Sequence, residues 1–249
     1  MIEQRIHPAS WQLPLGWQSE SDVQPHVSRR QVWSARMYPH LKRAFDFTAA
    51  FILLILLIPV FALIALIVRL DSPGPVFFVQ RRVGYQGRLF DFYKFRSMTN
   101  GQDHSQTHRK FAEAYIKGQG ADHLIDEQGR AIYKPAANGQ AVTRVGRWLR
   151  RTSLDELPQL VNILKGDISF VGPRPVLDYE VALFSDFHRL RLTAMPGLTG
   201  WAQINGRSSI SFDQIVSYDI EYIASRSLSR DLHILLATIP VVLGAENTK

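Results

Sequence analysis

An uncharged, apolar segment constrains this chain more than any other feature of its sequence. The segment runs from Phe47 to Val68, FTAAFILLILLIPVFALIALIV, and Thr48 is its only polar side chain. A bilayer core about 30 Å thick needs about 20 apolar residues in a straight helix, so the segment is long enough to span a membrane. The alternative is a buried core helix, but such helices rarely stay apolar on every face over this length. The sequence therefore predicts a membrane helix.

Pro59 and the flanking charges bear on how this helix enters the membrane. Proline removes a backbone donor and clashes with the preceding turn, so we expect a kink near Ile58. Basic residues mark the cytoplasmic side of a membrane segment, and here they flank both of its ends. A re-entrant helix, broken at Pro59, satisfies both flanks and is favoured; a kinked spanning helix remains the alternative. The basic flanks are Arg29, Arg30, Arg36, Lys42 and Arg43 before the segment, and Arg69, Arg81, Arg82 and Arg88 after it.

Composition narrows the class of protein further. Hydrophobic residues make up 46% of the 249 residues and charged residues 20%, which is typical of a packed core and excludes disorder of the whole chain. The net charge of +7 suits a polyanionic partner: nucleic acid, an acidic membrane surface or a phosphorylated substrate. The absence of cysteine excludes disulfides and thiolate metal sites.

The remaining pattern predicts a membrane-associated α/β (α+β) protein. We divide it into an N-terminal extension over 1–40, a re-entrant membrane helix over 41–70 and a compact α/β domain over 71–249, in which 100–142 form a polar insertion. Two strand-like runs, PVFFVQRR and RLFDFYKF, predict a small β-hairpin with its turn at Gly84 to Gly87. Several amphipathic helices complete the domain; we expect them over 106–117, 212–224 and 230–243, the last capped by Ser229.

Lys94 and Arg96 lie in the second strand of the predicted hairpin. They alternate with Tyr93 and Phe95, so we expect their side chains to share one face of the strand. Two interpretations are equally open at this point: a solvated strand face, or a pair of cations that binds phosphate.

The densest group of charged residues is the stretch VTRVGRWLRRTSLDELPQLVNILKGDISFVGPRP. Proline is tolerated in the first turn of a helix, so Pro158 predicts that Asp155 and Glu156 lie at a helix N-terminus. In one register Asp155 is the N-cap; in the other, Ser153 and Glu156 form a capping box. As caps alone, these residues would contribute only about 1 kcal/mol.

The arginines around this carboxylate pair favour a role in chemistry. A helix N-terminus with arginines is a phosphate site. Carboxylates placed there can hold a magnesium ion or attack phosphorus, because carboxylates form acyl phosphates. The basic residues are Arg144, Arg147, Arg150 and Arg151 before the pair, and Lys165 and Arg174 after it.

Two further motifs predict rigid turns that carry arginine. In Gly172-Pro173-Arg174-Pro175, the prolines fix the backbone on both sides of Arg174 and restrict where its guanidinium points; a structural turn and a phosphate site are equally open. In PGLTGWAQINGR, the Pro-Gly and Asn-Gly pairs mark turns around a short ordered segment. Arg207 follows the second turn, where it meets either a phosphate or a helix cap.

Four stretches, in order and at sensible spacings, resemble the bacterial sugar transferase family, the monotopic phosphoglycosyl transferases that initiate surface glycan synthesis. The resemblance covers about residues 41–245. Larger relatives carry several additional membrane helices before this core, which the first 40 residues cannot supply. The polar stretch 100–142 is longer than in the minimal members of the family, which suggests a lid or a determinant of sugar preference. The four stretches are KRAFDFTAAFILLILLIPV, QRRVGYQGRLFDFYKFRSM, LRRTSLDELPQLVNILKGDISFVGPRP and PGLTGWAQINGR.

This resemblance implies a function and roles for individual residues. It implies a magnesium-assisted transfer of sugar-1-phosphate from a UDP-sugar to undecaprenyl phosphate, with release of UMP, at the cytoplasmic face of the bacterial inner membrane. Asp155 would attack the β-phosphate and Glu156 would assist through the metal or a proton, so both are candidate metal ligands. The candidate substrate-binding residues are Lys94, Arg96, Arg151, Pro173, Arg174, Pro175 and Arg207.

Two rival functions belong to different classes. A membrane-anchored nucleic-acid or scaffold protein fits the net charge, but the basic residues cluster around the carboxylate pair, so we expect no nucleic-acid partner. A lipid-diphosphate hydrolase at the same site would release sugar phosphate into water. The sugar and the glycan pathway are not encoded in any motif that we identify, and a homodimer is compatible with the sequence.

Overall fold

The computed structural model of the protein describes residues 29–99, 105–118, 142–206 and 210–243. The chain forms two compact units, Met1–Met37 and Tyr38–Lys249. Only the beginning of helix α1 belongs to the described part of the first unit, so the predicted N-terminal extension lies mostly outside the described residues. All contacts discussed below lie within the second unit.

Helix α1 (Arg29–Asp71) contains the apolar segment. From Met37 to Asp71 it is long and apolar enough to cross a membrane, judged by length and composition, and only 11% of its most apolar window is buried within the protein. Leu56, Ile58, Leu63 and Leu66 are each more than half exposed. Because a core helix would bury these side chains, the exposure argues against the core-helix alternative and fits membrane association.

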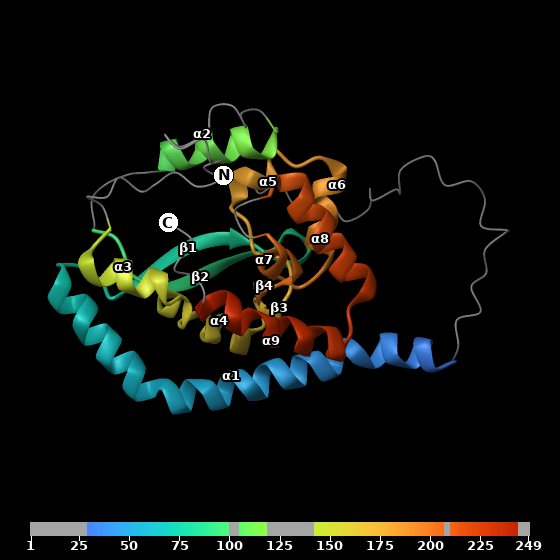
Figure 1. Ribbon diagram of the computed structural model, residues 1–249, viewed down its shortest axis with the longest axis horizontal. Helices are drawn as coiled ribbons and strands as arrows, with labels where there is room; N and C mark the ends of the chain where they lie inside the picture. Colours follow the sequence, from blue (N-terminus) through green and yellow to red (C-terminus); the bar gives the residue numbers. More distant parts are fainter. Residues whose placement is uncertain (1–28, 100–104, 119–141, 207–209, 244–249) are drawn as a thin grey trace, which may run out of the picture. The chain divides into compact units, whose positions relative to one another are not determined.

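The helix continues through Pro59, which lies inside α1, so the predicted break is not confirmed. Figure 1 shows that α1 nevertheless bends along its length. Proline inside a helix bends it without ending it when the surrounding hydrogen bonds persist.

The predicted β-hairpin is confirmed. Strands β1 (Phe77–Val83) and β2 (Leu89–Phe95) pair antiparallel, in a register that sets Phe78 opposite Lys94. The turn is the 3₁₀ segment η2 (Tyr85–Gly87), in which Gln86 and Gly87 adopt positive φ. Phe92 and Phe95, from opposite faces of β2, are almost completely buried. Strand β2 is thus covered on both faces at these positions, whereas Phe77, Phe78 and Val79 of β1 are exposed.

Three short elements follow the region 119–141. They are α3 (Arg144–Arg151), the 3₁₀ turn η3 (Leu154–Glu156) and α4 (Gln159–Lys165). The Thr143 side chain caps α3 by accepting a hydrogen bond from Gly146 N at 2.9 Å. A Cβ on Gly146 would lie 2.0 Å from Ser97 O, so only glycine lets α3 approach the end of the hairpin this closely.

A second, two-stranded sheet lies at the centre of the domain. Strand β3 (Ser169–Val171) pairs in parallel with β4 (Gly197–Thr199). Their connection contains α5 (Asp178–Val181), α6 (Asp186–Arg189) and the 3₁₀ segment η4 (Leu190–Thr193). A Cβ on Gly197 would lie 2.1 Å from Gly172 N, which explains why glycine stands at the crossing of these strands.

The remaining predicted helices are present, with one correction. Helices α2 (Ser105–Ile116) and α8 (Phe212–Ser225) match the expected positions, and the segment expected to be ordered between the Pro-Gly and Asn-Gly turns forms the short helix α7 (Trp201–Asn205). Helix α9 (Leu228–Leu243) begins before Arg230, and its predicted cap, Ser229, is wrong. The Ser227 hydroxyl accepts the hydrogen bond from Arg230 N, at 3.2 Å, so the chain turns into the helix earlier.

The core joins α1 to the globular domain at both ends of the apolar segment. In the first half, Ala50 packs with Phe92, Ile163 and Ile234. Helix α9 lies along this half of α1 (Figure 1), and Lys42 Nζ donates to Asp231 Oδ2 of α9 at 2.7 Å. The second half packs in a separate cluster formed by Ile64, Val68, Phe95 and Leu149.

Candidate active site

Asp155 and Glu156 lie in η3, not at the first turn of an α-helix. Neither predicted capping register is correct: Ser153 adopts a left-handed conformation (φ 56°) and makes no side-chain cap bond, and Pro158 is the N-cap of α4 rather than its third residue. Proline has no N–H to donate and fits best at a helix start, so α4 begins after it. The carboxylates are therefore held by a tight turn that precedes a helix of only seven residues.

The two carboxylates have different partners. Glu156 Oε1 accepts hydrogen bonds from Lys94 Nζ at 2.8 Å and from Arg174 Nη2 at 3.2 Å. Asp155 is only 7% exposed. Lys94 Nζ, 3.9 Å from Asp155 Oδ2, is the one cation within ion-pair distance of Asp155 among the residues that the structure describes. Glu156 is neutralised, whereas Asp155 keeps its oxygens available.

This difference also separates the pKa values of the pair. Burial raises the pKa of Glu156, but attraction to Lys94 and Arg174, together with their hydrogen bonds, outweighs burial and holds the pKa well below its usual range. For Asp155, burial raises the pKa, the Lys94 charge opposes this effect, and the neighbouring Glu156 charge adds to it. The net pKa of Asp155 lies above its ordinary value.

Lys94 and Arg82 flank one aromatic ring beside the carboxylates. The Lys94 ammonium lies 5.5 Å and the Arg82 guanidinium 4.6 Å from the centre of the Phe92 ring. Burial and the nearby Arg174 charge lower the pKa of Arg82 to about 10, and burial lowers the pKa of Lys94 despite Glu156. Arg82 was not among the predicted site residues. Strand alternation combined with the hairpin register would have placed Arg82 and Lys94 on one face.

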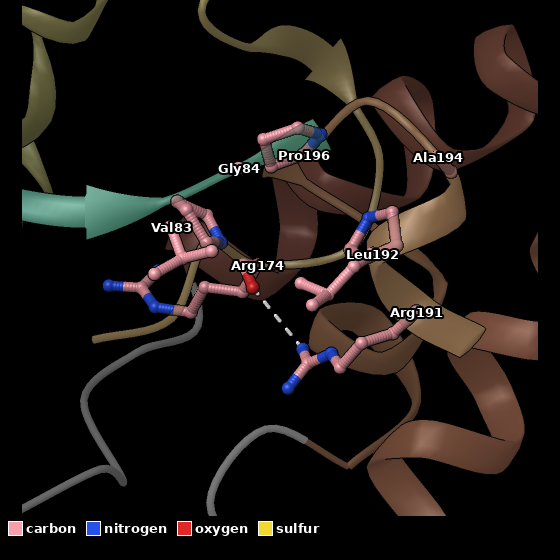
Figure 2. Close-up of a pocket in the computed structure, with 9 residues that line it drawn as sticks. Val83, Gly84, Arg174, Arg191, Leu192, Ala194 and Pro196 are labelled. Carbon is pink, nitrogen blue, oxygen red and sulfur yellow. Dashed lines mark hydrogen bonds between the residues drawn. The ribbon is translucent and has the colours of Figure 1, made fainter. Parts of the chain in front are cut away.

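The loop that carries Arg174 is fixed through its backbone. Pro173 and Pro175 are buried on either side of it. Figure 2 shows the Arg174 carbonyl facing the guanidinium of Arg191, whose Nη2 donates to this oxygen at 3.2 Å. A small cavity beside the loop is lined by both arginines and by Val83, Gly84, Pro173, Pro175, Leu192, Ala194 and Pro196. The Arg174 side chain is thereby aimed at Glu156.

The other predicted substrate-binding residues lie elsewhere. Arg96 is buried and donates to three backbone carbonyls at and after the end of α1: Val68 O at 3.2 Å, Ser72 O at 2.6 Å and Pro73 O at 2.6 Å. Lys94, two residues earlier, bonds to Glu156 instead, so the two cations have different partners. Arg151 is the exposed last residue of α3, and Arg207 lies outside the described residues. For these three arginines a substrate-binding role stays a prediction.

The carboxylate pair supplies the class of ligand that magnesium prefers. Magnesium takes oxygen ligands, and commonly one or two carboxylates that substrate phosphates and water complete. Among the described residues, no cluster of three or more His, Cys, Asp or Glu side chains is present, so Asp155 and Glu156 would be the protein's contribution. The two side chains fit this mode, with Lys94 and Arg174 competing for one Glu156 oxygen.

Together these residues suit chemistry on a phosphate ester. Arg82, Lys94 and Arg174 provide positive charge for a polyanion, and Asp155 provides a carboxylate that is not already neutralised by a close partner. The apolar part of α1, which begins after Met37, belongs to the same unit. The fold and the site thus have the features of a membrane-associated protein that acts on phosphorylated substrates.

Comparison with known proteins identifies the family. A model of the bacterial sugar transferase family matches residues 37–245, so the chain belongs to this family. It is 40% identical over 206 residues to the uncharacterized sugar transferase EpsL of Bacillus subtilis, covering 83% of this chain and 89% of that protein. It is 41% identical over 203 residues to the exopolysaccharide production protein ExoY of Rhizobium meliloti, covering 81% and 84%.

A longer relative has a more specific name. The chain is 37% identical over 207 residues to the UDP-glucose:undecaprenyl-phosphate glucose-1-phosphate transferase of Escherichia coli, covering 80% of this chain and 39% of that protein. Membership of the family makes the protein a transferase, and its exposed apolar helix is compatible with membrane association. The scaffold alternative is thereby set aside.

Proposed function

We propose that the protein transfers a sugar-1-phosphate from a UDP-sugar to undecaprenyl phosphate and releases UMP. This reaction would be the first membrane step in the synthesis of an exopolysaccharide, capsule, O-antigen or glycoprotein glycan. The names of its relatives support the acceptor and the type of reaction: one is an undecaprenyl-phosphate galactose phosphotransferase of Salmonella typhimurium. The observation that carries the proposal is the incompletely neutralised Asp155 beside Lys94, Glu156 and Arg174.

In the first step, a carboxylate oxygen of Asp155 attacks the β-phosphorus of the UDP-sugar. A bond forms between this oxygen and phosphorus, and the bond from the β-phosphorus to the bridging oxygen breaks. UMP leaves with the bridging oxygen, and the sugar phosphate stays on Asp155 as an acyl phosphate. An ionised carboxylate without a tight ion pair is the better nucleophile, which favours Asp155 over Glu156.

In the second step, a phosphate oxygen of undecaprenyl phosphate attacks the same phosphorus. The new phosphorus–oxygen bond replaces the bond to Asp155, whose carboxylate leaves unchanged. The product is the sugar linked to the lipid by a diphosphate. The acceptor lipid reaches the site from the bilayer, which agrees with a site in the same compact unit as the apolar segment of α1.

The surrounding residues have separate roles in this scheme. Arg174 binds the donor diphosphate and exchanges its contact with Glu156 for one with phosphate. Lys94 stabilises the negative charge of Asp155 before attack and of the phosphoryl group during it. Glu156 holds the two cations in place and, with Asp155, would hold magnesium. Bound magnesium supplies Lewis-acid stabilisation of the phosphate charge.

For the membrane topology we propose a re-entrant helix, with the catalytic domain on the cytoplasmic face of the bacterial inner membrane. Both ends of the apolar segment are tied to this same domain. Before it, Arg43 donates to Ile163 O at 2.6 Å and to Leu164 O at 2.7 Å. After it, Arg96 donates to the carbonyls of Val68 and Ser72. A straight span of about 30 Å would separate these ends across the bilayer.

Lipid-dependent release of UMP tests the proposed reaction. Purified protein in detergent would be incubated with magnesium and a panel of UDP-sugars, with and without undecaprenyl phosphate. We expect sustained UMP release with one donor only when the lipid is present. With that donor and no lipid, mass spectrometry should find a sugar phosphate on the peptide that contains Asp155.

Three outcomes would overturn parts of this proposal. Sustained release of free sugar phosphate without lipid would make the protein a hydrolase. The aspartyl intermediate would be excluded if rapid quenching finds no covalent adduct during lipid-dependent transfer and if Asp155→Asn transfers at the wild-type rate. For topology, tags at both chain ends should be equally protected in sealed vesicles, and unequal protection would mean that α1 spans the membrane.

A further inference from the structure

Three successive carbonyls of the Arg174 loop are each held by a different element. Pro173 O accepts from Gly197 N of β4 at 2.8 Å. Arg174 O accepts from Arg191 Nη2 of η4 at 3.2 Å, and Pro175 O accepts from Arg82 Nη1 of β1 at 2.7 Å. Two of the three donors are arginine side chains. This arrangement fixes each peptide plane of the loop, which the φ restriction of the prolines does not do alone.

Arg191 is almost fully buried together with an ionised partner. Its side chain is 3% exposed, and that of Asp219, on α8, is 2% exposed; Arg191 Nη2 and Asp219 Oδ2 are 2.8 Å apart. Within the described part of the chain, Arg191 Nε and Asp219 Oδ2 have no aligned hydrogen-bond partner, so the contact is an ion pair. The guanidinium also lies 5.5 Å from the centre of the Phe212 ring.

A buried ion pair is a poor means of gaining stability. Removing two charges from water costs about as much as their attraction returns, and a packed apolar pair often serves equally well. Arg191 uses one nitrogen for both Asp219 and the Arg174 carbonyl. If an apolar side chain replaced Arg191, the hydrogen bond to the Arg174 carbonyl would therefore be lost. This points to positioning rather than to stability.

We propose that Arg191, held by Asp219, is a positioning residue that sets the Arg174 loop for binding of the donor diphosphate. The effect of Arg191 on donor binding rests on the proposed function, whereas its contacts with Asp219 and the Arg174 loop do not. The Arg174 side chain is 42% exposed, and its one side-chain partner among the residues that the structure describes is Glu156. A long, partly exposed side chain keeps a fixed direction only if its backbone is fixed, and Arg191 supplies that restraint.

Lysine at position 191 separates the two contacts. It retains a positive charge for Asp219, so it avoids leaving a buried carboxylate unpaired. The lysine side chain is one bond shorter, so its ammonium does not reach the position of Arg191 Nη2, the nitrogen that meets both Asp219 and Arg174 O. We therefore choose Arg191→Lys, which preserves the ion pair while weakening the restraint on the loop.

A second arginine offers a closely matched control. Arg230 pairs with Glu221, also on α8, at 2.6 Å, and its guanidinium lies 4.5 Å from the centre of the Trp201 ring. It thus shares with Arg191 an α8 carboxylate and an aromatic ring. No contact of Arg230 with the Arg174 loop is found among the described residues. Arg230→Lys makes the same chemical change without touching the loop.

Hydrogen exchange tests the restraint without any enzyme activity. We expect the peptide covering Gly172 to Val176 to exchange about tenfold faster in Arg191→Lys, because opening of the loop exposes Gly172 N, which otherwise donates to Thr199 O at 2.9 Å. The same peptide should be unchanged in Arg230→Lys. Unchanged exchange in Arg191→Lys, or equal acceleration in both variants, would overturn the proposal.

A double-mutant cycle tests the consequence for the donor. Arg191→Lys should lower kcat/KM for the UDP-sugar about tenfold in the wild-type background, but less than about twofold when Arg174 is already alanine. A merely structural loss would lower activity by the same factor in both backgrounds, and that result would reject the positioning role. If wild-type protein releases no UMP, the proposed function fails, whereas the exchange result still decides the restraint.

Discussion

The carboxylates of η3 and of α9 make an instructive comparison. Asp231 of α9 is saturated: it accepts from Tyr38 at 3.0 Å, from Lys42 at 2.7 Å and from Tyr222 at 2.7 Å. Asp155 of η3 is equally buried, yet its closest cation among the described residues, Lys94, is 3.9 Å away. A carboxylate that only joins elements gains from every donor it meets. One that must attack phosphorus is better left with free lone pairs.

The first prediction removes the open carboxylate. Asp155→Asn should lower transfer at least about a thousandfold, because an amide is a poor nucleophile and a poor metal ligand. Its midpoint of thermal unfolding should stay close to wild type, since the Asp155 carboxylate accepts no hydrogen bond from the described part of the chain. UMP release and a melting curve on the same sample measure both. Asp178→Asn, at an exposed position, serves as control; equal loss in both variants would contradict the assignment.

The second prediction removes the saturated carboxylate. Asp231→Asn leaves Lys42 without its charged partner inside the α1–α9 contact, which should cost about 3 kcal/mol. For a domain of this size, such a loss corresponds to a fall of about 10 °C in the unfolding midpoint. The rate per folded molecule should change little at low temperature. A variant of unchanged stability with no activity would show that Asp231 belongs to the active site.

The third prediction compares two arginines. Arg174→Ala should raise the donor KM about tenfold with little change in stability, because its charge is partly exposed and available to phosphate. Arg43→Ala should lower stability and leave the donor KM nearly unchanged, because the two terminal nitrogens of Arg43 donate to the carbonyls of Ile163 and Leu164 in α4. Steady-state kinetics with melting curves separate the two. Unchanged donor kinetics in Arg174→Ala would assign Arg174 to structure.

The smallest expected effect is a shift in pH dependence. Burial raises the pKa of Asp155 above its usual value while Lys94 opposes the rise, so the ionised nucleophile is lost as pH falls through this raised pKa. Lys94→Met removes the opposing charge, and the acidic limb of kcat/KM for the donor should move to higher pH. Lys117→Met, which breaks an exposed pair with Glu113, should leave the limb in place. A limb that moves to lower pH in Lys94→Met would show that another group controls it.

Local patterns predicted the elements of this protein well. The hairpin, the ordered segment between the Pro-Gly and Asn-Gly turns, and the extents of α2 and α8 follow from alternation, turn residues and caps that neighbouring residues provide; that this segment is a helix, α7, was not predicted. The cap of α9 was missed because Ser227 and Ser229 are both suitable by type, and only the path of the chain between α8 and α9 selects one. The η3 turn was missed because a single left-handed residue, Ser153, separates it from an ordinary helix start.

The sequence by itself determined that this protein carries a membrane helix, a carboxylate pair and arginine-bearing turns, because composition and short motifs encode those features directly. Only the tertiary structure decided which cations meet the pair. In the folded protein, Lys94 and Arg174 both donate to Glu156, and Arg96 donates to a carbonyl just after the end of α1. Arg82 and Arg191 donate to carbonyls of the Arg174 loop. These contacts join residues far apart in the chain, and their partners depend on strand register and helix packing, which no local pattern records.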